Sequence, residues 1–318
     1  MSAPPLDILT VTLNPTIDLS TSVAAVVAGP KLRCAVPQID PGGGGINVAR
    51  AVRLLGGTAR ALVAVGGVAG DEIVTLLAEQ GVATVALRAP GDTRQSFAVT
   101  DRATGQQFRF VLPGPLWHPA DVEGAMAAIL GAVREGGLVV LSGSQPPGVP
   151  ADLPLRLAAR LKGRVRLLVD TSGDSLRAVA AGGDVAPWCL RMDDVEAAEL
   201  AGRPLIEADD SAAFASELVA RGVAEVVIIA RGADGGVLAA RGLRLHGRSA
   251  KVEVVSKIGA GDSFVGAFVL SIARGEGPAA ALRHGNAAAS AAVMTEATRL
   301  CRLVDVERLL PECVVAAL

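Results

Sequence analysis

Regular alternation between strand-like and helix-like segments after Pro119 is the feature that most constrains the fold of this 318-residue chain. Short apolar runs of the length of buried strands are separated by longer segments whose apolar residues have helical spacing. Strands are predicted at residues 138–142, 166–170, 188–191, 225–230 and 236–240, and helices near 121–134, 152–162, 174–181, 194–201 and 210–221. This pattern predicts an α/β fold with a mostly parallel sheet that helices cover on both faces.

The first third of the chain continues this pattern and also departs from it. The continuation consists of predicted strands at 8–13, 61–65 and 82–87 and predicted helices at 46–55 and 72–80. Residues 17–39 and 90–112 are instead strand-like without interleaved helices, and Ala103-Thr104-Gly105 is a hairpin signal. We therefore expect one domain over residues 1–318, with a small separate sheet formed by insertions at about 12–40 and 88–112. The end of the chain is expected to be nearly all helix, at 262–274, 278–294 and 304–316.

Two glycine-rich loops each lead into a helix-like segment. The first covers residues 41–45, and the second, at 257–266, carries Asp262 at the start of its helix. Backbone N–H groups at a helix N-terminus attract anions, and an adjacent acid is suited to take a proton from a nucleophile. The combination indicates phosphoryl transfer, with a simple helix-capping turn as the alternative. Neither loop has the spacing of a Walker A motif or of a dinucleotide-binding fingerprint.

Polar clusters follow several of the predicted strands, at 14–18, 142–144, 170–172, 191–194 and 231–232. In open α/β sheets ligands bind at the carboxyl ends of the strands. A single loop of this kind is usually only a turn. Five of them together with two glycine loops favour a binding site at that edge of the sheet.

Composition excludes some classes of function. Hydrophobic residues make up 51% of the chain, charged residues 19%, and the formal net charge is -2, which gives no indication of binding to nucleic acid or to an anionic membrane. The four cysteines include no C-x-x-C pair and are expected to be free thiols in a reducing cytoplasm. Residues 1–7 do not resemble a signal peptide, and we expect a cytoplasmic protein without a membrane span. The three histidines are interpreted as structural or surface residues.

Three motifs occur in a characteristic order, LNPTID at 13–18, GGGGINVAR at 42–50 and GAGD at 259–262. Together they resemble the ribokinase-like (PfkB) carbohydrate kinases over essentially the whole chain. Further segments point to the phosphosugar kinases of that family, namely KLRC at 31–34, TRQ at 93–95, QFRFV at 107–111, SGSQPPGV at 142–149 and TRLC at 298–301. The resemblance implies a ribokinase-like three-layer core with a mostly parallel central sheet and a small β-sheet lid.

The resemblance also implies a role for individual residues. Asp262 is expected to be the general base, and the backbone at Gly259, Ala260 and Gly261 the anion hole. Sugar phosphate contacts are implied for Asp18, Lys31, Gly42, Gly43, Asn47, Arg94 and Ser142. Nucleotide contacts are implied for Arg191, Arg231, Gly232, Gly235, Lys257 and Asn286. For Lys31 and Arg94 the alternative is a solvated surface charge.

Metal ions follow from the same resemblance. Asp193 and Glu196 match the positions associated with Mg²⁺ and phosphate placement, and carboxylate oxygens are the ligands that Mg²⁺ prefers. A monovalent cation, K⁺, is implied for Ser256, Ile258, Ala292, Thr295 and Ala297. The chain departs from the family pattern at 230–231, where Ala-Arg replaces the usual pair, at 191–193, where Arg-Met-Asp replaces Lys-Pro-Asn, and at Lys257, where close relatives often have Thr.

We therefore hypothesise MgATP-dependent phosphorylation of the 1-hydroxyl of fructose 6-phosphate. Tagatose 6-phosphate kinase and 1-phosphofructokinase are the alternative activities. Kinases of fructose 1-phosphate often carry a lysine in the first glycine loop, where this chain has four glycines. A catalytically weak sugar-phosphate sensor is a further alternative from another class, although Asp262 argues against it. The expected partners are ATP, the sugar phosphate and a second copy of the chain bound through the lid.

Overall fold

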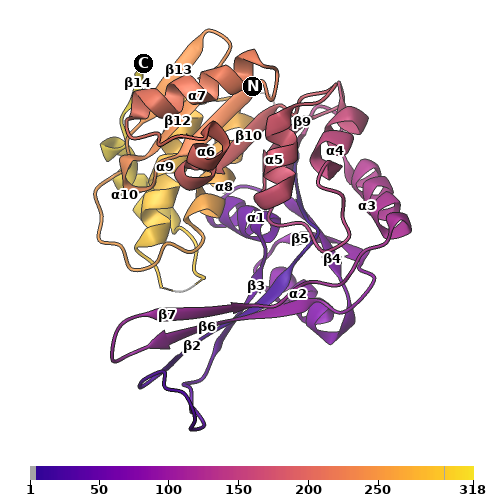
Figure 1. Cartoon of the computed structure of the whole chain (residues 1–318), viewed down its shortest axis with the longest axis vertical. Coiled ribbons are helices and arrows are strands. Elements are labelled where there is room, and N and C mark those ends of the chain that lie inside the picture. Colours follow the sequence, from indigo (N-terminus) through magenta and orange to yellow (C-terminus); the bar gives the residue numbers. More distant parts are fainter. Residues whose placement is uncertain (1–4, 297) are drawn as a thin grey trace.

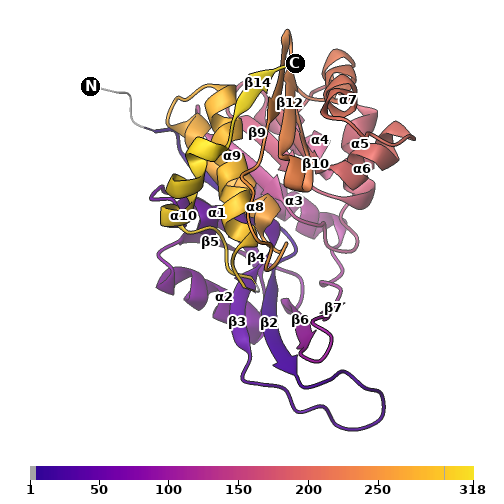
Figure 2. The same cartoon turned by 90° about the vertical axis from the view of Figure 1, so that its left-hand side faces the viewer.

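The computed structural model describes residues 5–296 and 298–318. Within this range the chain forms a ten-stranded sheet and a separate four-stranded sheet (Figures 1 and 2). The order across the large sheet is β14 (Val315–Ala317), β13 (Leu243–Gly247), β12 (Gly236–Ala240), β11 (Val226–Ala230), β10 (Cys189–Asp193), β9 (Arg166–Asp170), β8 (Leu138–Ser142), β1 (Ile8–Thr12), β4 (Arg60–Val65) and β5 (Ala83–Arg88). The strands from β11 to β5 are parallel, and β12, β13 and β14 continue the sheet in antiparallel pairing.

Helices cover both faces of the large sheet (Figure 1). Their bounds are α1 (Gly44–Leu54), α2 (Gly67–Glu79), α3 (Pro119–Ala132), α4 (Leu153–Leu161), α5 (Gly173–Ala181), α6 (Asp194–Ala201), α7 (Ala208–Ala220), α8 (Ala260–Ala273), α9 (Pro278–Val293) and α10 (Leu303–Leu309). Side chains alternate along a strand, so Val139 packs with α3 to α7 on one face and Val140 packs with α1, α8, α9 and α10 on the other. The predicted α/β fold with a mostly parallel sheet is confirmed.

The small sheet has the order β3 (Gln38–Gly42), β2 (Thr16–Val23), β6 (Arg94–Asp101) and β7 (Gln107–Val111). β2 and β6 run parallel, whereas β3 and β7 are antiparallel to their neighbours. Buried Ile17 of β2 joins Ile73 and Leu77 of α2 in an apolar cluster between the two sheets. Because β1 runs directly into β2, and β3 into α1, the small sheet lies at the carboxyl edge of the large one.

The C-terminal segment differs from its predicted structure. The predicted helix at 304–316 is wrong beyond Leu309, where a 3₁₀ turn at Leu310–Glu312 leads into β14. Pro311 has no N–H to continue an α-helix, and β-branched Val315 suits the free edge of β13. Strand β13 was not among the predicted strands. None of the helices in the described residues has the length and apolar character that a membrane span requires.

Candidate active site

Asp262 lies in the first turn of α8, at the carboxyl edge of the large sheet. Gly259 precedes the helix with φ of +77°, a left-handed conformation that glycine adopts readily. The first hydrogen bond of the turn runs from the Ser263 N–H to the Gly259 carbonyl. The N–H groups of Ala260, Gly261 and Asp262 therefore have no acceptor within the helix and carry the positive end of its dipole. This is the geometry of an anion site beside a carboxylate.

The Asp262 carboxylate is held by one side chain from α1. The Asn47 amide donates a 2.9 Å hydrogen bond from Nδ2 to Asp262 Oδ2. Burial raises the pKa of Asp262 to about 6, and neighbouring Asp170 adds to this shift, whereas Asn47 and the positive charges of Arg191 and Arg50 oppose it. An acid with this pKa is ionised at neutral pH and is still basic enough to accept a proton.

A second cluster lies at the ends of β8, β9 and β10, opposite the start of α8. Asp170 accepts a 2.9 Å hydrogen bond from the Ser142 hydroxyl and a 3.2 Å ion-pair contact from Arg191. A methyl group placed on Gly261 would lie 3.1 Å from Arg191 Nη2, so this guanidinium is against the anion-binding turn. The Ser142 hydroxyl is thus hydrogen-bonded to Asp170 in this structure. Arg191 belongs to the site because it contacts both Asp170 and the turn at Gly261.

The predicted sugar residues Asp18, Gly42 and Gly43 lie together where β2 and β3 leave the large sheet. A Cβ on Gly42 would overlap the Asp18 carboxylate, and one on Gly43, where φ is +122°, would lie 2.6 Å from a methyl group of Thr12. A side chain at Gly42 would therefore displace the Asp18 carboxylate, and the positive φ at Gly43 favours glycine. Burial raises the pKa of Asp18 to about 6, although the positive charge of Arg94 lowers it in part. Asp18 thus adds a second desolvated carboxylate to the site.

The two predicted phosphate residues are placed differently. Arg94, at the start of β6, donates to the carbonyl oxygens of Leu112 and Asn14 at 3.2 and 3.1 Å. Its Nε is buried without a partner among the described residues, and its charge faces Asp18. Lys31 is exposed in the connection between β2 and β3, and no strand forms at 24–37, which lies within the 17–39 segment predicted to be strand-like.

The predicted nucleotide residues fall at a neighbouring position on the same edge. Gly232 and Gly235 form the turn between β11 and β12, and both have positive φ. Asn286 of α9 is buried against Gly247 at the end of β13, and its Nδ2 has no hydrogen-bond partner among the described residues. A buried, unpaired amide is a group that a ligand can satisfy. Lys257 is exposed two residues before Gly259.

Arg231 has a different environment from the one expected of a nucleotide contact. Its buried guanidinium donates to the carbonyl oxygens of Leu205 and Ile206 and to the hydroxyl of Ser211. These three groups lie at and before the start of α7, so the side chain fixes that segment. The backbone of the 231–235 turn, rather than the Arg231 side chain, is what this geometry offers to a nucleotide.

The predicted magnesium residues form a reciprocal cap at the start of α6. Asp193 accepts from the Glu196 N–H at 2.8 Å, and Glu196 accepts from the Asp193 N–H at 3.0 Å. Each carboxylate keeps its second oxygen, and burial raises the pKa of Glu196. The described residues contain no group of three metal-ligating His, Cys, Asp or Glu side chains. The two carboxylates therefore fit Mg²⁺ only as neighbouring oxygen groups beside an ion that phosphates and water mainly hold.

The predicted monovalent-cation residues are brought together in part. The Ser256 N–H donates to the Val293 carbonyl, which places the 255–258 loop, including Ile258, beside the end of α9. The Ala292 carbonyl accepts from both the N–H and the hydroxyl of Thr295, at 3.0 and 2.8 Å. Ala297 lies outside the described residues.

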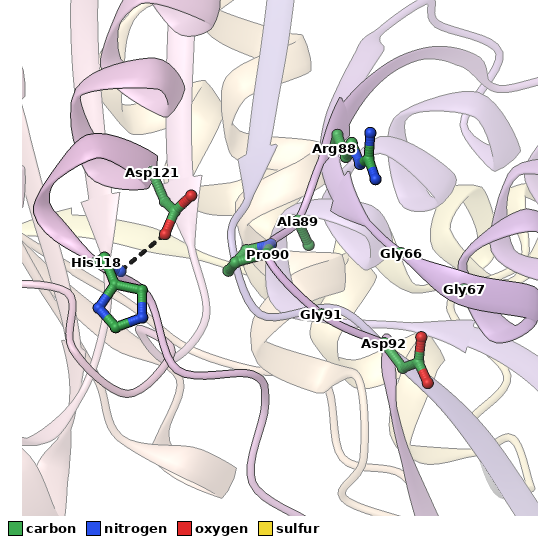
Figure 3. A pocket seen from close by; sticks show the side chains of 9 residues that line it. All are labelled: Gly66, Gly67, Arg88, Ala89, Pro90, Gly91, Asp92, His118 and Asp121. Atoms are coloured by element: carbon green, nitrogen blue, oxygen red, sulfur yellow. Dashed lines mark hydrogen bonds between the residues drawn. The ribbon is translucent and has the colours of Figure 1, made fainter.

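A pocket of about 470 Å³ lies apart from these residues, between the starts of α2 and α3 (Figure 3). Figure 3 shows His118 with its backbone N–H hydrogen-bonded to Asp121 at 2.8 Å, which caps α3. None of the predicted site residues lines this pocket. The contact uses the His118 backbone, and the interpretation of His118 as a structural or surface residue stays a prediction.

Asp170 and Arg50 contact residues of the site, and the sequence did not assign either of them a role. Asp170 bridges Ser142 and Arg191, and its position at a strand end was the available signal. Arg50 contacts Asn47 and is paired with Asp40 at 3.0 Å. Arg50 is a charge on the buried side of α1, which only the fold reveals.

The chain is similar to known proteins over nearly its whole length. The pfkB family carbohydrate kinase profile matches residues 11–304. ATP-dependent 6-phosphofructokinase isozyme 2 of Mycobacterium tuberculosis (strain CDC 1551 / Oshkosh) is 40% identical over 302 residues, covering 95% of this chain and 88% of that protein. The protein of the same name in Escherichia coli K12 is 36% identical over 95% of this chain and 97% of its own length. The 1-phosphofructokinase of Xanthomonas campestris pv. campestris is 31% identical over 96% of this chain and 95% of its own length.

Solved structures give the same result. Phosphofructokinase-2 from E. coli in complex with potassium superposes with a TM-score of 0.90, and the same protein in complex with fructose-6-phosphate with 0.88. Both are 35% identical to this chain and cover 96% of it and 99% of their own chains. An Arabidopsis thaliana ribokinase, at 18% identity, shares the fold with a TM-score of 0.74, over 97% of this chain and 99% of its own. The predicted ribokinase-like fold and carbohydrate kinase activity are confirmed, and the chain belongs to the pfkB family of carbohydrate kinases.

Proposed function

We propose that this kinase transfers the γ-phosphoryl group of ATP to the 1-hydroxyl of fructose 6-phosphate, giving fructose 1,6-bisphosphate and ADP. The observation that carries the proposal is the Asp262 carboxylate, with its pKa raised to about 6, in the first turn of a helix with free N–H groups. The relatives named as ATP-dependent 6-phosphofructokinases, at 36 to 40% identity, support the choice of substrate.

The chemical step uses one acid and one helix N-terminus. Asp262 takes the proton of the sugar hydroxyl as its oxygen forms a bond to the γ-phosphorus. The bond between that phosphorus and the bridging oxygen breaks, and ADP leaves with the electron pair. General base catalysis of this kind is worth about 10²–10⁴-fold in rate. The N–H groups at 260–262 stabilise charge on the transferred phosphoryl group, and each preorganised donor is worth about 10²–10³-fold.

The sugar lies between the small sheet and the starts of α1 and α8. Asp18 and Asn47 hold sugar hydroxyls, with the Gly42–Gly43 backbone close by. Ser142, at the end of β8, contacts the sugar from the large sheet, where its hydroxyl is hydrogen-bonded to Asp170. Arg94, whose charge faces Asp18 from the same small sheet, pairs with the sugar phosphate, together with Lys31 once the 24–37 connection closes over the site.

The nucleotide lies along the ends of β10 to β13. The 232–235 turn and the unpaired Asn286 amide contact it, and Arg191 and Lys257 flank its phosphates. Asp193 and Glu196 would hold Mg²⁺ through water beside those phosphates. When bound, Mg²⁺ supplies positive charge to the phosphate oxygens. A K⁺ ion beside Ser256, Ile258 and Thr295 is part of the same proposal, supported by the potassium complex of the E. coli relative.

The small sheet acts as a lid and as the contact to a second copy of the chain. Leu19 pairs with Ile39 and Phe97, and Phe97 pairs with Phe110, so one apolar row crosses all four strands. Phe110 is 55% exposed and Ile39 40% exposed. Such a face is usually covered by a partner. If a second copy covers it, Phe110→Asp gives a monomer in sedimentation velocity, whereas an unchanged dimer contradicts the assignment.

One assay tests the substrate. ADP release is measured with MgATP and, in turn, fructose 6-phosphate, tagatose 6-phosphate, fructose 1-phosphate and unphosphorylated fructose. We expect the highest kcat/KM with fructose 6-phosphate. Highest activity with fructose 1-phosphate would favour the function of the 31% identical relative, and highest activity with tagatose 6-phosphate would replace the ketose assigned here. Sugar-phosphate binding without any turnover would indicate a sensor.

A further inference from the structure

Arg50 carries a buried charge close to the proposed base, and its guanidinium is almost fully hydrogen-bonded. The residue is 7% exposed. It donates to Gln80 Oε1 at 2.7 Å, to Asn47 Oδ1 and Asp40 Oδ1 at 3.0 Å, and to the Pro41 carbonyl at 3.2 Å. A buried charge is costly unless it is paired and hydrogen-bonded, so this network holds the guanidinium in one place.

The contact with Asn47 decides which way that amide faces. Asn47 and Arg50 are three residues apart on α1 and therefore lie on the same side of the helix. An arginine can only donate, so Arg50 selects the amide oxygen as its partner. The amide nitrogen is then turned to Asp262 Oδ2, at 2.9 Å. A flipped amide would present an oxygen to the carboxylate and repel it.

This arrangement has a consequence for the reaction. The Asn47 N–H stabilises the ionised carboxylate and occupies Oδ2, which leaves Oδ1 of Asp262 for the proton of the sugar. We propose that Arg50 is a positioning residue, which keeps Asp262 ionised and aimed by fixing the Asn47 amide, and that Asp40 fixes Arg50 in turn. The inference rests on the proposed role of Asp262 as the base.

Asp40 connects this chain of bonds to two distant parts of the molecule. It belongs to β3 of the small sheet, and its Oδ2 accepts from the Thr298 hydroxyl at 2.5 Å and from the Gln38 amide at 2.6 Å. Thr298 lies in the connection between α9 and α10. The path from Asp40 through Arg50 and Asn47 thus joins the small sheet to the base.

The test compares Arg50→Lys with the wild type in the pH dependence of kcat. Lysine keeps the positive charge but cannot bond Asn47, Asp40 and Gln80 at the same time. Asp170 from β9 and Arg191 from β10, the other charges that face Asp262, are unchanged. The profile is measured at saturating fructose 6-phosphate, so that Asp18, whose pKa is also about 6, is engaged by the sugar.

We expect the acid limb of the kcat profile to move up by about one pH unit in Arg50→Lys. The reason is that the Asp262 carboxylate loses the well-aligned N–H of Asn47, which raises the pKa of Asp262. The value of kcat then falls about tenfold below pH 6 and recovers at high pH. When Asn47→Ala is already present, adding Arg50→Lys should not move the acid limb any further. An unchanged limb, a loss of equal size at every pH, or the same movement without Asn47 would overturn the proposal.

Controls separate this effect from damage to the fold. Arg53→Lys changes an exposed arginine of the same helix and should leave the profile unchanged. If Arg50→Lys does not fold, as judged by circular dichroism, Gln80→Ala removes a single exposed partner of Arg50 and should give a smaller movement in the same direction. No movement there would count against the proposal. A wild type without turnover on any sugar phosphate would instead refute the proposed function.

Discussion

Replacing the Asp262 carboxylate by its amide should change activity and stability in opposite directions. In Asp262→Asn the proton acceptor is lost, and we expect kcat to fall by about 10²–10⁴-fold with little change in sugar binding. The folded protein should nevertheless become harder to unfold at neutral pH. The reason is that Asp262 is ionised there in an environment that disfavours its charge.

The size of this gain follows from the pKa. Burial, with a contribution from Asp170, raises the pKa of Asp262 from 3.8 to about 6 in the folded state. The stability that the protonated acid contributes is complete below pH 4 and is lost as the pH rises through 6. Above pH 7 the ionised carboxylate destabilises the folded state by about 3 kcal/mol, at about 1.4 kcal/mol for each unit of pKa. The amide is neutral at every pH and avoids this penalty.

Urea unfolding at pH 5, 6 and 7.5, together with ADP release, measures both effects. The stability advantage of Asp262→Asn should grow with pH and level off above pH 7. Asp71→Asn changes an exposed acid on α2 and should show no such trend. An advantage that stays constant or shrinks with rising pH would refute the desolvation argument. A near-normal kcat would remove Asp262 from its role as base.

Three further predictions concern other parts of the site. Arg94→Ala should raise KM for sugar phosphates about 10–100-fold and change KM for unphosphorylated fructose little; equal effects on both would place the phosphate contact elsewhere. Gly42→Ala should raise the sugar KM at least about tenfold in steady-state assays, because its methyl group would displace the Asp18 carboxylate. Gly124→Ala, with open space at its Cβ, is the control and should match the wild type. Asp193→Ala should lower the free energy of unfolding by about 1 kcal/mol in urea through loss of the α6 cap, and should raise the Mg²⁺ concentration needed for half-maximal rate; an unchanged requirement would leave it only as a cap.

Local sequence was sufficient to predict most of the large sheet and the position of Asp262 at the start of a helix. Helical and strand periodicities are set by neighbouring residues, so the strands that end at Ser142 and Asp170 were predicted with the bounds that they have in the structure. The helix predicted to 316 failed because strand β14 depends on the edge of β13, which is remote in sequence. Arg231 was expected to face a nucleotide because its turn resembles the nucleotide-binding loop of the family. Its guanidinium instead donates to carbonyl oxygens in the segment before α7.

The sequence by itself determined the alternating α/β architecture, the two glycine loops and the identity of Asp262 as the acid at a helix start. These features are local, because backbone propensity and the needs of a helix N-terminus are expressed within a few residues. The tertiary structure alone decided the surroundings of that acid. Asp170, which adds to the raised pKa, and Asn47, which bonds the carboxylate, lie more than 90 positions from Asp262 in the sequence, and Thr298 lies at least as far from Arg50 and Asp40. Burial and electrostatic contact depend on distance in space, and only the folded chain sets that distance.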